Sequence, residues 1–315
     1  MAPSSRAPAD LSIILSTRNR CASLVQTLAS FRGLEVPLRS ELLLVDNGST
    51  DGTWDAVNSY RHPTLEVRRI MEETPGVSYA RNRGLSECSG RVVVFTDDDV
   101  RVFPGWITSL VRLLLDGGAD AVVGGIRLPE HLAKAWMTPL HRSLFASTEL
   151  LDPERPAHLI SANMAVVRTV LSKVPGFDVE LDPGRLGAWG DSLFSWQVRE
   201  AGFRLRGAFD FAIEHHFDET RLSRASLLRA ARVQGVCRAY VAHHWHHESR
   251  PGSARRLLRR LLDLAKLRMR NRVSAEGVPM AELQLIESIW LERQWMHESR
   301  RPRNYTRRGL TRITR

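Results

Sequence analysis

Three consecutive aspartates, Asp97, Asp98 and Asp99, follow an apolar run that extends from Arg91 to Thr96. The β-branched residues of this run predict a buried strand, so the three carboxylates would gather at its exit. Neighbouring carboxylates repel one another and contribute nothing to folding alone. A divalent cation such as Mg²⁺ or Mn²⁺ prefers oxygen ligands and couples carboxylates to phosphates. A solvated acidic turn is the alternative, and the triplet alone does not decide between them.

Two other polar clusters follow apolar runs in the first half of the chain. Residues 16–18 come after a run that begins at Leu11, and residues 46–48 follow Leu42–Val45. Because ligands of doubly wound sheets bind beyond the carboxyl ends of the strands, we expect all three clusters to share one crevice. The Asp-Asn-Gly sequence at 46–48 is equally typical of a turn, which leaves a purely local role for Asp46 open.

Alternating strands and helices would position these clusters. Strands are predicted where short apolar runs stand between turn residues: Leu11–Ser16, Leu42–Val45, Leu65–Ile70, Val92–Thr96 and Ala121–Val123. Helices are predicted over Cys21–Phe31, Ser78–Ser86 and Trp106–Leu115, with another that ends at Tyr60 and is capped by Ser49 or Thr50. This alternation indicates an α/β fold with a doubly wound, mostly parallel sheet.

The second half is less regular and turns helical. Helices are predicted over Asp191–Ala201, Leu222–His243, Ala254–Arg272 and Ala281–Trp295. From Arg300 onward, arginine, proline and polar residues dominate, which predicts disorder.

Composition is typical of a globular protein, with 315 residues, 43% hydrophobic and 25% charged. The three cysteines are widely spaced, so we expect reduced thiols rather than disulfides or a zinc site. No apolar segment resembles a signal peptide or a membrane span, so we expect a cytoplasmic protein. The net charge of +10 belongs to residues 250–315, which hold 17 basic and 6 acidic residues.

The basic region includes an amphipathic helix, in which Leu257, Leu258, Leu261, Leu262 and Ala265 form one stripe. We expect this stripe to pack on the catalytic domain, with the arginines solvated. The alternative is an anionic membrane surface, as for other interfacial helices with basic faces. Nucleic acid is a third option, but no aromatic-basic interleaving supports it, so we expect none as a partner.

Four motifs in the first 100 residues resemble glycosyltransferase family 2, an inverting family. Residues 12–20 are similar to its opening strand, and residues 45–53 (VDNGSTDGT) resemble its signature almost letter for letter. Residues 80–84 (ARNRG) match a helix start of the family, and Thr96–Asp99 resembles its DxD metal motif. The resemblance covers about residues 10–240 and implies the GT-A fold of nucleotide-diphospho-sugar transferases.

The resemblance also implies how the donor is bound. Asp97 would contact the ribose side of the donor and share the metal, Mn²⁺ or Mg²⁺, with Asp99, while Asp98 lies beside them. Asp46 would bind the base and Arg81 would lie near the nucleotide. The base pocket would be lined by Ser16, Thr17 and Arg18. The cation would stabilise the charge that grows on the leaving diphosphate.

Further residues are implied for the acceptor side. In the family a general base follows a GFDE-like turn, and here Asp191 takes its position after Gly176–Asp178. Gly190 replaces the usual glutamate before it. Asp191 would also suit a helix N-cap. Asn163 resembles the residue of a GxNxA segment near the sugar, and Trp189 would stack on a sugar ring unless it is a core residue.

A histidine completes the metal site of the family. His215 is preferred to His216 because Arg221 follows it at the family's spacing of six residues. The later histidines at 243–247 are interpreted as a solvated helix end rather than a zinc site.

We therefore predict a GT-A catalytic domain over residues 10–221, with a donor-nucleotide half (10–125) and an acceptor half (126–221). A flexible N-terminus (1–9) precedes it, and a helical extension (222–299) and a basic disordered tail (300–315) follow. The reaction would move a sugar from a nucleotide-diphospho sugar to an acceptor hydroxyl on a glycan, a lipid-linked molecule or a natural product. The alternatives are a nucleotidyltransferase, which lacks support because residues 16–20 contain no glycine, and an inactive protein that binds anionic membrane or nucleic acid. If the basic helix binds lipid, the site of action would be the inner face of the membrane.

Overall fold

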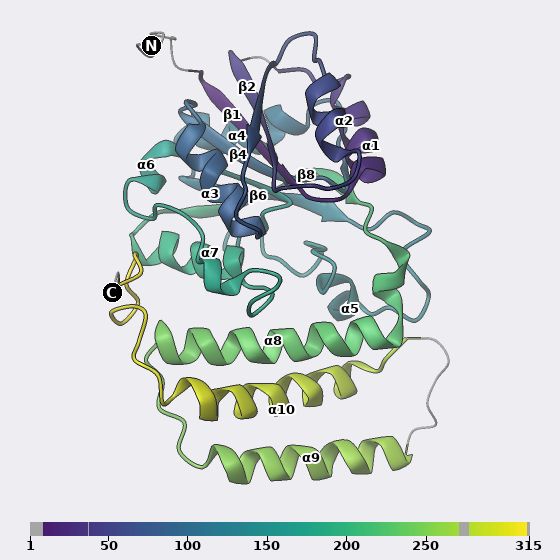
Figure 1. Cartoon of the computed structure of the whole chain (residues 1–315), viewed down its shortest axis with the longest axis vertical. Helices are drawn as coiled ribbons and strands as arrows, with labels where there is room; N and C mark the ends of the chain where they lie inside the picture. Colours follow the sequence, from purple (N-terminus) through teal and green to yellow (C-terminus); the bar gives the residue numbers. More distant parts are fainter. Residues whose placement is uncertain (1–8, 37, 271–276, 314–315) are drawn as a thin grey trace.

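The computed structural model describes residues 9–36, 38–270 and 277–313. Its centre is an eight-stranded sheet in the order β3-β2-β1-β4-β7-β6-β8-β5 (Figure 1). The strands are β1 (Leu11–Thr17), β2 (Ser40–Asp46), β3 (Glu66–Met71), β4 (Val92–Asp97), β5 (Val100–Arg101), β6 (Ala121–Arg127), β7 (Asn163–Val167) and β8 (Leu205–His215).

Strands β3, β2, β1 and β4 are parallel, and they bring the polar clusters at 16–18, 46–48 and 97–99 to one edge of the sheet. β7 is antiparallel to both of its neighbours, β4 and β6, whereas β6 is parallel to β8 and β5 is antiparallel to β8. The predicted α/β fold with a mostly parallel, doubly wound sheet is confirmed.

Helices cover both faces of the sheet. They are α1 (Cys21–Phe31), α2 (Thr53–Ser59), α3 (Val77–Glu87), α4 (Trp106–Leu115), α5 (Pro139–Ser143), α6 (Arg168–Leu171) and α7 (Gly190–Glu200), with 3-10 turns η1 (Val179–Leu181) and η2 (Glu219–Leu222). α1 and α4 share one face, where the rings of Phe31 and Trp106 lie 5.6 Å apart. α3 packs on the other face, where Gly84 approaches Ile14 so closely that a β-carbon would lie 2.6 Å from its Cγ2.

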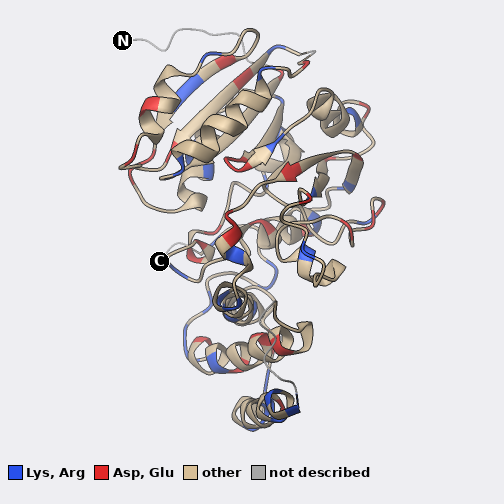
Figure 2. Ribbon diagram, turned by 90° about the vertical axis from the view of Figure 1, so that its right-hand side faces the viewer, with Lys and Arg blue, Asp and Glu red and all other residues tan. Residues whose placement is uncertain are grey.

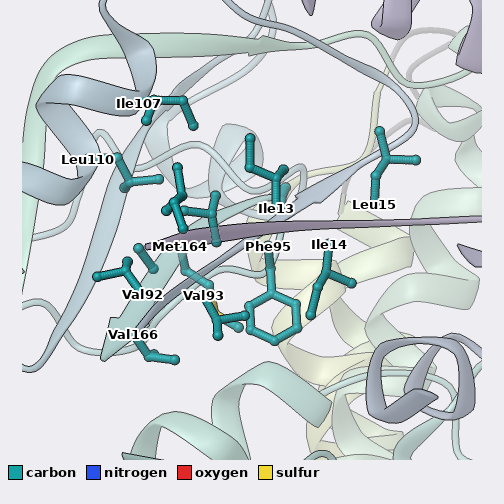
Figure 3. Packing of buried hydrophobic residues seen from close by; sticks show 14 of the residues in the cluster. Ile13, Ile14, Leu15, Val92, Val93, Phe95, Ile107, Leu110, Met164 and Val166 are labelled. Carbon is teal, nitrogen blue, oxygen red and sulfur yellow. The ribbon is translucent and has the colours of Figure 1, made fainter. Parts of the chain in front are cut away.

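The core follows from the alternation of side chains along the central strands. Ile13 of β1 points toward Ile107 and Leu110 of α4, while Ile14 points to the opposite side with Phe95 of β4 (Figure 3). On that second side Phe95 meets Phe177 edge to face, at 5.3 Å between ring centres. Both faces of β1 are therefore buried under apolar side chains, which explains its continuous apolar sequence.

Three long helices form a layer beyond the sheet: α8 (Arg224–His244), α9 (Ser253–Arg270) and α10 (Met280–Glu298). α10 lies between α8 and α9, so α9 is the outermost element (Figure 1). Glu292 of α10, which is buried, accepts hydrogen bonds from Arg250 and Arg256 and thereby ties α10 to the start of α9. Among the described residues, no helix combines the length and the hydropathy that crossing a bilayer requires.

The expected packing of the amphipathic helix on the catalytic domain is not observed. Only Ser253 and Leu264 of α9 are buried, and the helix contacts α10 instead of the sheet domain. Four of the five residues of the predicted apolar stripe are exposed: Leu258, Leu261, Leu262 and Ala265.

The interpretation of residues 243–247 as a solvated helix end is also wrong. His243 and His244 are buried, and the Nε2 of His244 lies 3.0 Å from a carboxylate oxygen of the fully buried Glu298. This pair links α8 to the end of α10. The run from His243 to His247 contains no acidic residue. The carboxylate that contacts His244 therefore comes from Glu298, which is remote in sequence.

The end of the chain is more ordered than its composition predicts. Tyr305 is only 3% exposed, and its hydroxyl donates a hydrogen bond of 2.7 Å to Asp178, which also accepts one from Tyr240. The indole N–H of Trp245 donates to the carbonyl oxygen of Gly309. Residues 300–313 are therefore held against α8 and the loop before α7, and the last two predicted tail residues lie outside the described part of the chain.

Candidate functional site

A cleft of about 400 Å³ opens at the carboxyl ends of β1, β2 and β4. Six of the predicted donor-binding residues line it, and the complete lining is Ser16, Thr17, Arg18, Arg20, Asn47, Gly76, Val77, Ala80, Arg81, Asp97, Asp98 and Pro183. Three arginines and two aspartates in one cleft suit a ligand that carries both phosphate and hydroxyl groups.

Each aspartate of the triplet has its own partners. Asp97, the last residue of β4, accepts a hydrogen bond of 2.9 Å from Arg81 of α3. Asp98 accepts one of 2.7 Å from the hydroxyl of Thr17 and forms an ion pair of 3.1 Å with Arg20. The same guanidinium lies 2.9 Å from Asp99. Arg20 therefore offsets the mutual repulsion of Asp98 and Asp99.

Burial and charge act differently on these carboxyl groups. Burial raises the pKa of Asp98 to about 7, since Arg20 offsets only part of the desolvation. Burial alone would also raise the pKa of Asp99. The contact with His215 and the charge of Arg20 outweigh burial, so the pKa of Asp99 lies below its ordinary value. The pKa of His215 moves upward, because Asp99 outweighs the opposing effect of burial.

His215 and Asp99, two of the predicted metal ligands, contact each other. The Nε2 of His215 lies 3.3 Å from Oδ1 of Asp99, and its Nδ1 lies 2.9 Å from the carbonyl oxygen of Phe145. Metal-binding histidines typically have one ring nitrogen fixed by a backbone carbonyl or a carboxylate, as Nδ1 of His215 is, which leaves the other nitrogen for the metal. His216 lies instead beside Glu214, at 3.1 Å, so the geometry favours His215 over His216.

The third proposed ligand, Asp97, does not join this pair. Its carboxylate turns toward Arg81, and no group of three or more His, Cys, Asp or Glu side chains with metal-binding geometry occurs among the described residues. Asp99 Oδ1 is nevertheless buried and has no hydrogen-bond partner there. A buried carboxylate oxygen facing an imidazole suits a divalent cation that takes its other ligands from a bound diphosphate.

Unsatisfied polar atoms gather around the cleft. Besides Asp99 Oδ1, the buried atoms without a hydrogen-bond partner in the described residues include Ser16 Oγ, Asp46 Oδ2 and Asp182 Oδ2. Each such atom costs about 1–3 kcal/mol. Of these four residues Ser16 lines the cleft, whereas Asp46, Asp99 and Asp182 are next in the chain to the lining residues Asn47, Asp98 and Pro183.

Asp46 does not line the cleft. It is fully buried, and its Oδ1 accepts a hydrogen bond of 2.8 Å from the backbone N–H of Ser49, which is the turn role left open by the sequence. Its neighbour Asn47 lines the cleft instead. The amide of Asn47 binds Glu72, Thr74 and Gly76 and so holds the loop that leads into α3.

Asp191 lies in the first turn of α7, but it is not the N-cap. That position belongs to Trp189, whose φ of +76° is unusual for a residue with a side chain. Asp191 is half-buried, and its Oδ2 lies 3.4 Å from both the N–H and the hydroxyl of Ser161. A β-carbon placed at Gly190 would lie 3.5 Å from Oγ of Ser78, so α7 begins beside the cleft-lining start of α3.

The two residues predicted to contact the sugar are placed elsewhere. Asn163 is fully buried: it accepts a hydrogen bond from the indole of Trp106 and donates one to the carbonyl oxygen of Gly125, both at 2.8 Å. It therefore joins β7 to β6 and α4 within the core. Trp189 is half-buried against Trp196, and its indole donates to Gln234 of α8. Neither residue lines the cleft, and Asn163 has no exposed surface with which to contact a sugar, whereas the contact predicted for Trp189 stays a prediction.

Other residues of the site were missed in the sequence. Arg20 binds two aspartates of the triplet, and its place two residues after Arg18 was the available signal. Asp182 reaches back to α3, where it accepts a hydrogen bond of 2.7 Å from the N–H of Ser78. Burial raises the pKa of Asp182, and no local pattern indicates this long-range cap. His158 lies near Asp191, and burial lowers its pKa despite that negative charge.

Known proteins share both the sequence and the architecture. Among curated relatives, the pre-mycofactocin glycosyltransferase of Mycobacterium tuberculosis is 27% identical over 215 residues, which cover 65% of this chain and 42% of that protein. The glycosyltransferase AglE of Haloferax volcanii is 26% identical over 205 residues, 64% of each chain. The chain thus spans less than two thirds of the length of these relatives.

Two solved structures share the fold. The mannosyltransferase PcManGT of Pyrobaculum calidifontis, in complex with GDP-Man and Mn²⁺, has a TM-score of 0.55 at 19% identity, covering 92% of this chain and 73% of that one. TarS 1–349 of S. aureus has a TM-score of 0.53 at 20% identity, covering 72% of this chain and 64% of that one. The family model described as glycosyl transferase family 2 matches residues 12–174. The chain belongs to glycosyl transferase family 2.

Proposed function

We propose that this protein is an inverting, metal-dependent glycosyltransferase that moves a sugar from a nucleotide-diphospho sugar to an acceptor hydroxyl. The observation that carries the proposal is the 3.3 Å contact between His215 and Asp99, which follows the cleft residue Asp98 in the chain, together with the three arginines that line the cleft. The bound GDP-Man and Mn²⁺ of the archaeal structure with the same fold are consistent with this class of donor.

The donor would occupy the cleft at the ends of β1, β2 and β4. Ser16, Thr17 and Asn47 would surround the base and ribose, and Arg18 and Arg81 would face the negative charge of the diphosphate. Asp99 and His215 would hold Mn²⁺ or Mg²⁺, with Asp97 close by at the end of β4. The cation, when bound, would supply Lewis-acid stabilisation of the leaving diphosphate.

Asp191 is proposed as the general base. Its carboxylate is half-buried at the start of α7, where the backbone N–H of Ser192 and the N–H and hydroxyl of Ser161 orient it. It would accept the proton of the acceptor hydroxyl as that oxygen attacks the anomeric carbon, and the bond to the diphosphate would break on the opposite side of the sugar. Attack from the face opposite the leaving group inverts the anomeric configuration.

Thermal unfolding with a panel of nucleotide sugars, each with and without Mn²⁺, tests the proposal. A donor that fits raises the melting temperature by mass action, and the rise needs the cation. Isothermal titration with the matching nucleoside diphosphate then measures the affinity independently of turnover. The proposal of a metal-dependent donor site fails if EDTA leaves diphosphate binding unchanged. Product analysis of the anomeric configuration tests the inverting step separately.

A further inference from the structure

The outermost helix, α9, presents an apolar stripe to solvent. Leu258, Leu261, Leu262 and Met269 are 61%, 46%, 54% and 80% exposed, and with the exposed Ala265 they recur at intervals of three and four residues. These positions share one face of the helix. Exposed large apolar side chains gathered on one helix face are unusual in a surface that has no partner.

Basic side chains border this stripe. α9 carries seven Lys and Arg residues and one acidic residue, Asp263. Arg255, Arg259, Lys266 and Arg270 are exposed and make no ion pair with the described residues. Figure 2 shows the blue segments on this lowest helix, farthest from the sheet. An apolar stripe beside solvated cations is the arrangement of helices that lie in the interface of anionic bilayers.

The opposite side of α9 is already in use. Leu264 is buried toward α10, and Arg256 and Arg268 form ion pairs with Glu292 and Glu282 of that helix. α9 is therefore fixed to the protein by one face while the other is left for a ligand. A groove of about 520 Å³ lies between α9 and α10, and a further basic residue of α9, Arg260, lines it.

We propose that the exposed face of α9 docks the protein on an anionic lipid surface. The leucines and Met269 would enter the boundary between headgroups and acyl chains, and the four solvated cations would attract lipid phosphates. A second copy of the chain does not fit, because two such helices would bring like charges together. Nucleic acid would neutralise the cations but would leave the leucines without a partner. This inference is independent of the proposed chemistry, since it concerns a different face.

Flotation of the intact chain with vesicles tests the docking. Binding to vesicles of phosphatidylglycerol mixed with phosphatidylcholine is expected, with at least tenfold weaker binding to phosphatidylcholine alone. The triple variant Leu258→Gln, Leu262→Gln, Met269→Gln should lose about tenfold or more in affinity. The variant Arg255→Gln, Arg259→Gln, Lys266→Gln should also bind weakly, and the wild type should lose binding in high salt.

Matched control variants distinguish vesicle binding through the exposed face of α9 from nonspecific binding through other surface residues. Leu115→Gln with Leu150→Gln removes two equally exposed leucines of the sheet domain, and Arg32→Gln, Arg155→Gln, Lys173→Gln removes three exposed cations there. Both controls should bind vesicles like the wild type. Equal losses in the controls, or no vesicle binding at all, would overturn the proposal. So would a doubled mass in light scattering that the α9 leucine variant abolishes, since a second copy would then be the occupant.

Discussion

The Nε2 of His215, at the end of β8, lies 3.3 Å from Oδ1 of Asp99 in the turn after β4. This contact joins the turn after β4 to the end of β8, two parts of the sheet that are more than 100 residues apart in the chain. We expect His215→Ala to weaken Mn²⁺-dependent binding of the nucleoside diphosphate at least about tenfold, because a ligand and its orienting contact are both lost. Titration calorimetry measures the change. His216→Ala is the matched control, because His216 contacts Glu214, and an equal loss in it would argue against a specific role for His215.

The position of Asp191 predicts a split between catalysis and binding. Asp191→Asn keeps the shape of the side chain and one of its two acceptor oxygens, but it removes the ability to accept a proton. Turnover should fall by about 10²–10⁴-fold. The affinity for the donor nucleotide should stay unchanged, because Asp191 does not line the donor cleft. Ser192→Ala is the control, and unaltered turnover in Asp191→Asn would assign the base to another residue.

Stability against acid should depend on Glu292. Burial alone would raise its pKa, but hydrogen bonds from Arg256 and Arg250 outweigh burial and lower the pKa to about 2. Its stabilisation is thus fully present above the unfolded pKa near 4.5 and is lost as the pH falls toward 2. At pH 7, Glu292→Gln should lose about 2 kcal/mol, because a buried charge-assisted pair is broken.

Urea unfolding at several pH values checks the effect of Glu292. The difference between wild type and Glu292→Gln should shrink between pH 4.5 and 2. Glu287→Gln is a suitable control, because Glu287 also lies on α10 but pairs with Arg238, a half-exposed side chain. A constant difference across this range would show that the charge of Glu292 is not the cause.

Gly190 is not required by the backbone. It does not have a positive φ, and a β-carbon there would meet only Oγ of Ser78 at 3.5 Å, an ordinary contact. We therefore expect Gly190→Glu to keep or slightly raise the melting temperature, since an acidic residue suits the first turn of a helix. Differential scanning calorimetry measures this. Gly84→Glu is the contrast, because its β-carbon would collide with Ile14, and it should unfold well below the wild type.

Local patterns in the sequence were sufficient for most of the fold. The predicted bounds of α1 and α4 agree with the structure, because periodicity and a Gly-Gly stop signal are properties of the segment itself. α2 starts later than predicted, with Gly52 rather than Ser49 or Thr50 at its N-cap. The N–H of Ser49 is instead bound by Asp46, so the turn extends further before the helix begins.

The site was less predictable wherever a role depends on distant partners. The cleft residues follow from strand ends that topology brings together, whereas His215 was predicted from the resemblance alone. Asn163 is different, because its amide is satisfied by Trp106 and Gly125, which no pattern around residue 163 indicates. Arg20 was missed for a related reason, because its role depends on ion pairs with two aspartates that are remote in sequence.

The two tyrosine hydroxyls on Asp178 connect the end of the chain to the segment before α7. Asp178 precedes η1, and Tyr240 and Tyr305 clamp it from α8 and from the last residues. Proteolytic trimming or a bulky fusion after residue 300 would remove half of this clamp. The loop that leads to Asp191 would then gain freedom, so a cut far along the chain would disturb the position of this carboxylate.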